Sequence, residues 1–460
     1  MDPVEPATAS NPTLRPGTGE GGTLREVFLL AYPVILTQVS VTLMQLVDSA
    51  MVGRLGASEL GAVGFGGIWM WTAVSLFMGT ATAVQTFVAQ EHGAGRAHLC
   101  GAWTWQGFYA VVPAMLAGSF AIYWLSPHLV AAVGPSDSLR PLATDYLQSR
   151  SFGSTGLIAG AVITAFFRGL GDTRTPLYCT ILAVLFNAVL DYGLIFGELG
   201  LPAWGVYGAG FATSASEWFQ LACLVAFASR RQIRIRFDTR PRLPGWAQTR
   251  RLLRTGLPIG GQWCLEMTSF AAFSAIVVRM GDESMAATQA LIVVLSLSFM
   301  QAVAISISVA TLVGRYIGAG DLVSATRSYW TGMKLVSALA IAFAILFLSI
   351  PGPLIRIFTD DAQVLALSGP LLVLAAAFQI FDAFGIVTDG GLRGAGDTLW
   401  PFVVRFLMAW CVQVPLSYGL GVVLGGGLTW AWVGSMIYVA ATAAILVGRF
   451  RSGAWQSIRI

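Results

Sequence analysis

The chain has 460 residues, of which 56% are hydrophobic and only 11% carry a charge. Soluble domains carry about 25% charged residues, so this composition excludes an ordinary water-soluble globule and indicates a membrane protein. A net charge of +4 gives no reason to expect a nucleic-acid partner. The five cysteines are scattered without a CxxC pair, as is typical of small packing residues.

In chain order, the first predicted element is a disordered tail over residues 1–24, which are rich in Pro, Gly, Thr and Glu. An N-terminal lobe over 25–229 follows, made of six apolar stretches that are each long enough to cross a bilayer. These spans lie near 27–52, 60–89, 102–125, 146–167, 175–197 and 204–228.

An arginine-rich linker over 230–250 then leads to a C-terminal lobe over 251–449, and residues 450–460 form a second tail. The spans of this lobe lie near 252–278, 285–314, 330–350, 367–391, 399–422 and 428–448. The predicted fold is therefore an all-α membrane protein with twelve transmembrane helices in two six-helix lobes.

The arginines of the linker predict the orientation. Residues 229–254 contain nine arginines, and placing them in the cytoplasm puts both chain ends there as well. The opposite side then keeps only a few cationic residues, as the positive-inside rule requires: Arg54, Arg140, Arg150, Arg279 and Arg356. We expect a multi-pass protein of the inner (plasma) membrane, with phospholipid binding as an alternative role for the linker.

The sequence repeats itself at one constant offset, which aligns residue 52 with residue 277. Three glycine-containing segments match: 52–56 with 277–281, 93–95 with 318–320, and 167–173 with 392–398. Each half has six spans and so starts on the same side of the membrane. The halves are therefore predicted to be related by a pseudo-twofold axis along the membrane normal, as in transporters with a site between two lobes.

Acids that are not duplicated are expected to report function, because a charge at membrane depth is costly unless it faces a cavity or a partner. In the first half these are Asp48 and Asp191, and neither recurs at the equivalent position of the second half. Asn187 lies one turn before Asp191 and faces the same way, and Thr213 adds a hydroxyl. This set offers hard oxygen ligands for Na⁺, and a buried carboxylate can also hold H⁺.

The second half has its own unduplicated acids, Glu266 and Asp382. Gln262 lies one turn before Glu266, and Gln379 lies three residues before Asp382, so these amides are positioned to bind the acids or a cationic substrate. Na⁺ at Glu266 and Asp382 is a further interpretation. For every one of these acids, plain hydrogen bonding inside a helix bundle is the alternative.

Two more acids, Glu217 and Asp389, are candidates of the same kind. The charged residues of the repeated RGxGDT turns are expected to be structural, with each Asp near the N-terminus of the next helix. These residues are Arg168, Asp172, Arg393 and Asp397.

Pro33 lies near the start of the first span and recurs as Pro258. A proline inside a membrane helix removes a backbone hydrogen bond and predicts a kink. Because Asp48 follows on the same helix, a bend at Pro33 would move that acid relative to the second lobe.

The sequence contains no motif for an enzyme. There is no GxxxxGK[ST] phosphate loop and no HExxH, and Lys334 is the single lysine. We therefore expect neither catalysis nor a cofactor, apart from H⁺ or Na⁺ as a coupling ion.

In combination, several segments resemble the multidrug and toxic compound extrusion (MATE) transporters. The resemblance rests on QLVDSAMVGRLG at 45–56, on both RGxGDT turns, and on Asp382 followed by GLRG at 391–394. It implies twelve helices in two lobes around a V-shaped cleft that opens to alternate sides. It also implies export of organic cations and other amphipathic drugs in exchange for Na⁺ or H⁺.

The resemblance also implies roles for individual residues. Asp48 matches a coupling acid of the first helix, and the N-lobe cation site is matched by Asn187, Asp191 and Thr213. The C-lobe acids typical of the bacterial NorM-type branch are matched by Glu266 and Asp382. The other branch, DinF-type, usually keeps only the N-lobe set, so the presence of both leaves the coupling ion open.

The predicted function is multidrug efflux by a monomeric secondary antiporter, whose partners are amphipathic cationic small molecules, H⁺ or Na⁺, and membrane lipid. Aromatic and Met side chains such as Trp69 and Met300 are candidates to hold flat apolar cations loosely. One alternative is a lipid-linked oligosaccharide flippase, which would need several arginines at membrane depth, and Arg405 is the main candidate. A second alternative is a membrane receptor or scaffold that transports nothing.

Overall fold

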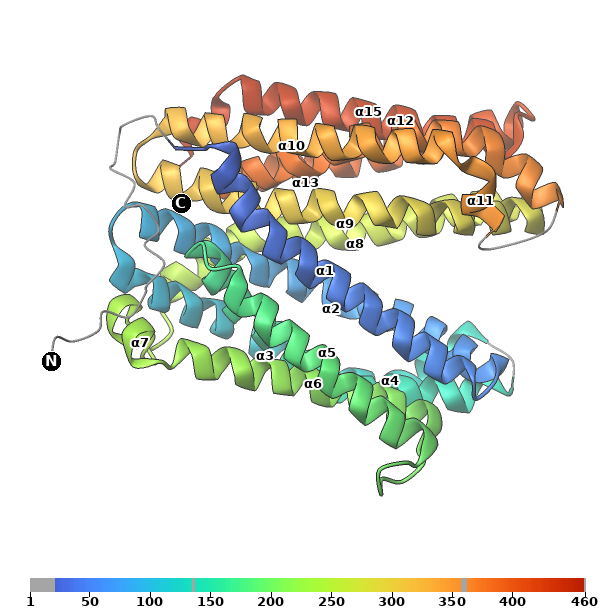
Figure 1. Cartoon of the computed structure of the whole chain (residues 1–460), viewed down its shortest axis with the longest axis horizontal. Helices are drawn as coiled ribbons and strands as arrows, with labels where there is room; N and C mark the ends of the chain where they lie inside the picture. Colours follow the sequence, from blue (N-terminus) through green and yellow to red (C-terminus); the bar gives the residue numbers. More distant parts are fainter. Residues whose placement is uncertain (1–20, 135–136, 357–361, 459–460) are drawn as a thin grey trace, which may run out of the picture.

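The computed structural model describes residues 21–134, 137–356 and 362–458. Over these ranges the chain forms helices joined by short turns, and no strand is present (Figure 1). The N-terminal helices are α1 (Leu24–Gly53), α2 (Ala57–Gly93), α3 (Cys100–Val133), α4 (Leu139–Gly169), α5 (Arg174–Phe196) and α6 (Gly205–Ala228). A short helix, α7 (Arg231–Phe237), lies in the predicted linker.

The C-terminal helices are α8 (Trp246–Val278), α9 (Asp282–Gly318), α10 (Leu322–Ser349), α11 (Pro351–Arg356), α12 (Ala362–Ala395), α13 (Leu399–Met408), α14 (Val414–Tyr418) and α15 (Gly427–Arg451). Together α13 and α14 make one span, continued by π-helical turns. Ten helical segments of the described chain are long and apolar enough to cross a membrane, and α6 and α8 occupy the other two predicted spans. The predicted all-α membrane fold is confirmed.

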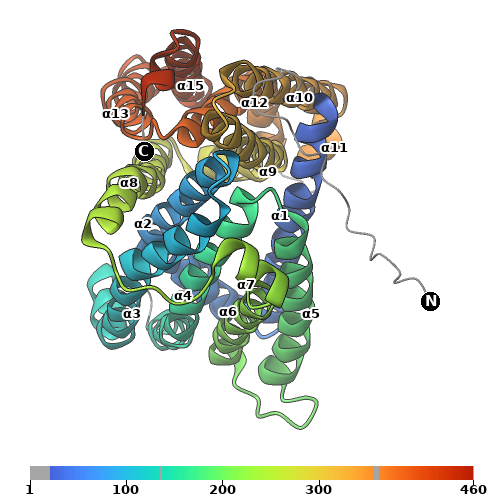
Figure 2. The same cartoon turned by 90° about the vertical axis from the view of Figure 1, so that its left-hand side faces the viewer.

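The molecule consists of two bundles, α1–α6 and α8–α15, which lie side by side (Figures 1 and 2). In the first bundle α4 packs against α2, α3 and α6, and in the second α12 packs against α9, α10 and α15. These are equivalent helices of the two repeats, so the duplicated sequence produces duplicated packing. We call the end of the molecule that carries α7 the linker end, and the end that carries α11 the far end.

The two predicted tails differ in how much of each the structure describes. Residues 1–20 lie outside the described part of the chain, whereas Gly21 and Gly22 pack against α9 and α10, with the Gly22 amide 3.3 Å from the Tyr316 hydroxyl. At the other terminus, Trp455 is only 1% exposed and stacks on Phe450 in the C-lobe core. Both described ends of the chain are thus held by the C-terminal lobe.

Helix α1 runs diagonally from one bundle to the other (Figure 1). Near its start, Val27 and Ala31 are buried in the core of the C-terminal bundle. Near its end, Val52 is buried against Ile195 and Ala209 of the N-terminal bundle. Pro33 lies inside this continuous helix, so movement of one lobe against the other must bend or reorient α1.

The lobes meet most closely at the linker end, where α2 lies against α9. A Cβ added to Gly93 would fall 1.8 Å from the carbonyl oxygen of Arg315, and one added to Gly318 would fall 2.0 Å from that of Gln90. These two contacts are equivalent under the sequence repeat. Only glycine allows the backbones to approach this closely, as at other packed membrane helices.

Paired hydrogen bonds reinforce this contact. The Thr86 hydroxyl donates to the Arg393 carbonyl at 3.0 Å, and the Thr311 hydroxyl donates to the Arg168 carbonyl at 3.0 Å. The Gln85 amide adds bonds of 2.9 Å to Thr311 and to a backbone carbonyl of α9. We call Thr86, Thr311 and the two carbonyls that they bind the inter-lobe latch. It explains why the repeated RGxGDT turns are needed in both halves.

Candidate functional site

Asp48 and Asp191 approach one another in the N-terminal lobe. Asp48 lies on α1 and Asp191 on α5, each near the far end of its helix. Their side chains are within hydrogen-bonding reach of one another. Asp191 and Asn187 are both fully buried, whereas Asp48 is half-buried. The structure therefore brings together two acids that lie far apart in the sequence.

The polar atoms of this group have no hydrogen-bond partners. Both carboxylate oxygens of Asp191, both amide atoms of Asn187 and Oδ1 of Asp48 are buried and unbonded. Buried polar groups in proteins are nearly always paired, so each exception requires an explanation. Two ionised carboxylates can only accept, so a hydrogen bond between Asp48 and Asp191 forms when one of them holds a proton. The same oxygens suit a small cation chemically.

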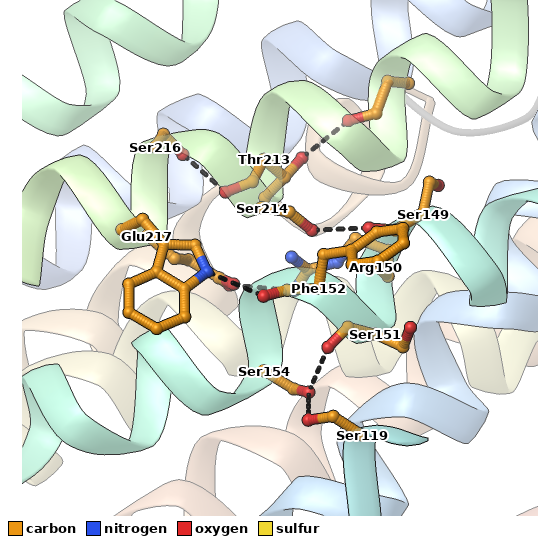
Figure 3. A network of polar contacts seen from close by, with 12 residues as sticks. Ser119, Ser149, Arg150, Ser151, Phe152, Ser154, Thr213, Ser214, Ser216 and Glu217 are labelled. Carbon is orange, nitrogen blue, oxygen red and sulfur yellow. Dashed lines mark hydrogen bonds and ion pairs between the residues drawn. The ribbon is translucent and has the colours of Figure 1, made fainter. Parts of the chain in front are cut away.

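An ion pair lies next to these acids. The Arg150 guanidinium on α4 contacts the Glu217 carboxylate on α6 at 2.9 Å, and both side chains are about one-tenth exposed (Figure 3). Ser149 and Ser214 join the same two helices through a bond of 2.8 Å. Arg150 is close enough to influence the charge of Asp48 and Asp191. Arg150, which the sequence places on the side opposite the linker, is thus buried inside the lobe against Glu217.

The remaining residue of the predicted N-lobe set is bonded within its own helix. The Thr213 hydroxyl on α6 donates to the Ala209 carbonyl at 2.9 Å (Figure 3). Among the described hydrogen bonds, none joins Thr213 to Asp48 or Asp191. Its oxygen keeps a lone pair for a ligand.

The C-terminal lobe has a separate charged cluster. Glu266 on α8 contacts Arg405 on α13 at 3.1 Å, and Asp382 on α12 lies near enough to interact electrostatically with both. Tyr438 on α15 is within hydrogen-bonding reach of Arg405. Arg405 thus lies mostly buried in the C-terminal bundle, where it is paired with a glutamate.

Asp382 lines a cavity of about 300 Å³ inside this lobe. Gln379 and Gln413 contribute amides to its wall, while Phe273 and Trp432 contribute aromatic rings. A pocket of this size with aromatic walls and a few polar groups is typical of small-molecule sites. One carboxylate among aromatic rings is suited to a monovalent organic cation.

The two predicted amides have other partners than the acids they precede. Gln262 bonds Asp389 at 3.4 Å and accepts from Arg393 at 3.1 Å, so it joins the Asp389–Arg393 ion pair instead of Glu266. Gln262 lies one helical turn from Glu266 toward the linker end, and neither of these bonds goes to Glu266. Gln379 accepts from Ser298 and donates to a backbone carbonyl of α10 while it lines the cavity.

The acids of the RGxGDT turns have structural partners. Asp172 accepts from the backbone amides of Arg174 and Thr175 at 3.1 and 3.0 Å, which caps α5. Asp397 pairs with Arg449 at 2.9 Å. Sequence reasoning missed that the Arg168 and Arg393 carbonyls accept the bonds of the inter-lobe latch. It recognised Glu217 but missed its partner Arg150, although Arg150 does not recur in the second repeat either and this signal would have singled it out.

Two repeated helical bundles with buried, unduplicated charges define a polytopic membrane protein of the transporter class. The MatE family model matches residues 33–193 and 258–419, which are equivalent stretches of the two repeats. The chain therefore belongs to the MatE family, whose members are transporters.

Relatives named as multidrug resistance proteins align with nearly the whole chain. A probable multidrug resistance protein NorM from Geobacillus kaustophilus is 30% identical over 440 residues, covering 94% of this chain and 95% of the relative. The multidrug resistance protein MdtK from Edwardsiella ictaluri is 28% identical over 439 residues, covering 93% and 95%.

Solved structures of similar fold include a MOP superfamily transporter from Pyrococcus furiosus, with a TM-score of 0.88 and 19% identity over 96% of this chain and 98% of that one. The eukaryotic MATE transporter AtDTX14 has a TM-score of 0.82 and 19% identity over 94% and 96%. At this identity the likeness concerns the fold alone.

Proposed function

We propose that the chain is a secondary antiporter that exports organic cations across the inner membrane in exchange for H⁺, with the linker end in the cytoplasm. The observation that carries this proposal is the contact between Asp48 and Asp191, two acids without hydrogen-bond donors at the far end of the N-terminal lobe. Its relatives named as multidrug resistance proteins support the same function.

The geometry favours H⁺ over Na⁺ at this site. Two carboxylates in contact repel one another, and one shared proton removes that repulsion and supplies the missing donor. Na⁺ would need several oxygens around it, and it would sit beside the fixed positive charge of Arg150. We therefore assign Asp48 and Asp191 as the proton-coupling pair, with Na⁺ as the competing outcome of the test below.

Coupling requires that H⁺ and the organic cation prefer different conformations. In the described conformation the latch holds the lobes together at the linker end, and the helix bundles diverge toward the far end (Figure 1). Protonation of the N-lobe pair would favour this conformation, in which the cation leaves toward the far end. When the latch then opens, the pair would release its proton to the cytoplasm and a new cation would bind from that side.

The C-lobe cavity is the substrate site that we propose. Its single carboxylate, Asp382, supplies the charge, and rings such as Phe273 and Trp432 supply a flat apolar surface. Its volume of about 300 Å³ accommodates a small aromatic cation.

The proposal is tested in proteoliposomes that contain the purified protein and a fluorescent organic cation such as ethidium. We expect an imposed pH gradient to drive its movement, and an imposed Na⁺ gradient at constant pH to have no effect. Ethidium movement driven by the Na⁺ gradient alone would mean that Na⁺, and not H⁺, is the coupling ion. No movement under either gradient would contradict antiport of organic cations.

The latch makes a separate prediction. Replacing Thr86→Val and Thr311→Val removes three inter-lobe hydrogen bonds at nearly constant side-chain shape, because the Thr311 hydroxyl also accepts from Gln85. At about 1 kcal/mol each, their loss should shift the equilibrium toward the form open at the linker end by roughly 150-fold.

The measurement for this latch variant is the labelling rate of Ala89→Cys with a membrane-impermeant thiol reagent, because Ala89 is fully buried in the described conformation. Faster labelling in the double Thr→Val background is the expected result. The control is the Ala89→Cys protein with both latch threonines intact and with Ser337→Ala, which removes a hydroxyl that is bonded within α10 and lies outside the latch. Equal labelling rates with and without the latch threonines would contradict the assignment.

The flippase alternative needs arginines that are free to bind a pyrophosphate. Arg150 and Arg405 instead pair with Glu217 and Glu266. This observation speaks against an anionic lipid as the substrate.

A further inference from the structure

The Glu266–Arg405 pair is built differently from a purely structural ion pair. One guanidinium nitrogen, Nη1, contacts Glu266 at 3.1 Å, while Nε is buried without a partner. Arginine binds a carboxylate most strongly through two parallel hydrogen bonds, which this geometry does not use. The Arg405 side chain is 11% exposed and that of Glu266 is 36% exposed, so the pair lies at the edge of an accessible space.

None of these charges belongs to the duplicated framework. The equivalent residues of the first repeat are Val41 for Glu266, Leu157 for Asp382 and Thr180 for Arg405. The N-terminal lobe therefore reaches the same packing without them. Since burying a charge is costly in a membrane, all three require a reason that the shared fold does not supply.

The net negative charge of this cluster is smaller than its two acids alone would give, because Arg405 neutralises part of it. Glu266 and Asp382 together could hold a metal cation between them, but the Arg405 guanidinium already supplies one positive charge at Glu266. A second cation near Glu266 would be repelled by Arg405. Asp382 is then the one acid that keeps a free charge for a ligand in the cavity.

We propose that Arg405 is a specificity-determining residue that occupies the cation position at Glu266 with its own guanidinium. It thereby excludes Na⁺ from the C-terminal lobe and leaves Asp382 to bind a single organic cation. The binding of an organic cation by Asp382 rests on the proposed function. The exclusion of Na⁺ does not, because it depends only on the protein's own charges. It assigns this lobe to the substrate rather than to a coupling metal ion.

The test is a binding measurement on the full-length protein in detergent or nanodiscs. Thermal unfolding is followed in NaCl and in KCl at equal ionic strength. We expect the wild-type protein to unfold at the same Tm in both salts. Arg405→Gln is expected to gain a saturable Na⁺-specific rise in Tm of about 2 °C or more, because a ligand that binds only the folded state stabilises it by mass action.

Two further variants identify which side chains cause the Na⁺-specific rise in Tm. Arg405→Lys keeps the positive charge and should stay insensitive to Na⁺, whereas Glu266→Gln combined with Arg405→Gln removes the exposed carboxylate and should lose the gain. A merely structural role for Arg405 would lower Tm equally in both salts. That result, or a Na⁺ response in the wild-type protein that Glu266→Gln removes, would overturn the proposal.

A variant that fails to fold does not leave the question open, because the wild-type protein provides a second measurement. Ethidium binding to the wild-type protein should be unaffected by replacing KCl with NaCl, and competition by Na⁺ that Glu266→Gln abolishes would contradict the proposal. These readouts need no transport. A protein that binds as expected but moves nothing would refute the antiporter and leave the role of Arg405 intact.

Discussion

A disulfide between α2 and α9 is expected to reduce transport to the background of membranes without the protein. A Cβ at residue 314 lies 3.1 Å from the Cβ of Ala89, slightly closer than the usual separation in disulfides. The pair Ala89→Cys and Gly314→Cys should therefore cross-link under mild oxidation with a small backbone adjustment. If the lobes must separate at the linker end in each cycle, the cross-linked protein cannot take up a new cation from that side.

The measurement is ethidium transport before oxidation, after oxidation and after reduction. Each single-cysteine variant, treated with the same oxidant, controls for the native cysteines, of which Cys100 and Cys179 are buried and unpaired. Recovery of transport after reduction shows that the block is the cross-link itself. Full transport by a quantitatively cross-linked protein would refute alternating access through the latch.

The second large effect is expected from the acid pair. Asp48→Asn and Asp191→Asn each keep the side-chain volume but remove the group that exchanges a proton. A coupling free energy of about 1–3 kcal/mol corresponds to a change of roughly 5- to 150-fold in affinity. We therefore expect each variant to lower the rate of pH-driven transport by at least about 5-fold.

A matched control for these variants is Asp172→Asn, which makes the same chemical change at a helix cap that asparagine also tolerates. The two N-lobe variants should retain ethidium binding, because the cavity lies in the other lobe. Normal pH-driven transport by both Asp48→Asn and Asp191→Asn would show that this pair does not couple the cycle.

The sequence by itself determined the helical framework. Apolar stretches of membrane length gave the twelve spans, and the constant offset of the repeat gave the two equivalent bundles. Both signals are local or simply periodic, so they survive without knowledge of long-range packing. The same repeat singled out Asp48 and Asp191 as residues that the duplicated fold does not need.

Only the tertiary structure decided which of these charges meet. Within one helix, spacing predicts neighbours, as for Asn187 and Asp191, but it does not fix the facing helix. Gln262 illustrates the limit, since a single turn separates it from Glu266 and yet its hydrogen bonds go to Asp389 and Arg393 on α12. Glu217 was recognisable as an unduplicated acid, but Arg150 became its partner only when α4 packed against α6.

The crossing of α1 between the lobes was likewise invisible in the sequence. The apolar residues that it buries at its two ends are of the same kind, and their pattern does not distinguish the core of one bundle from that of the other. Membrane helices choose their neighbours by close shape matching and a few polar contacts rather than by hydrophobicity. The membrane-length helices could therefore be predicted from the sequence, whereas partnership between helices emerged from packing alone.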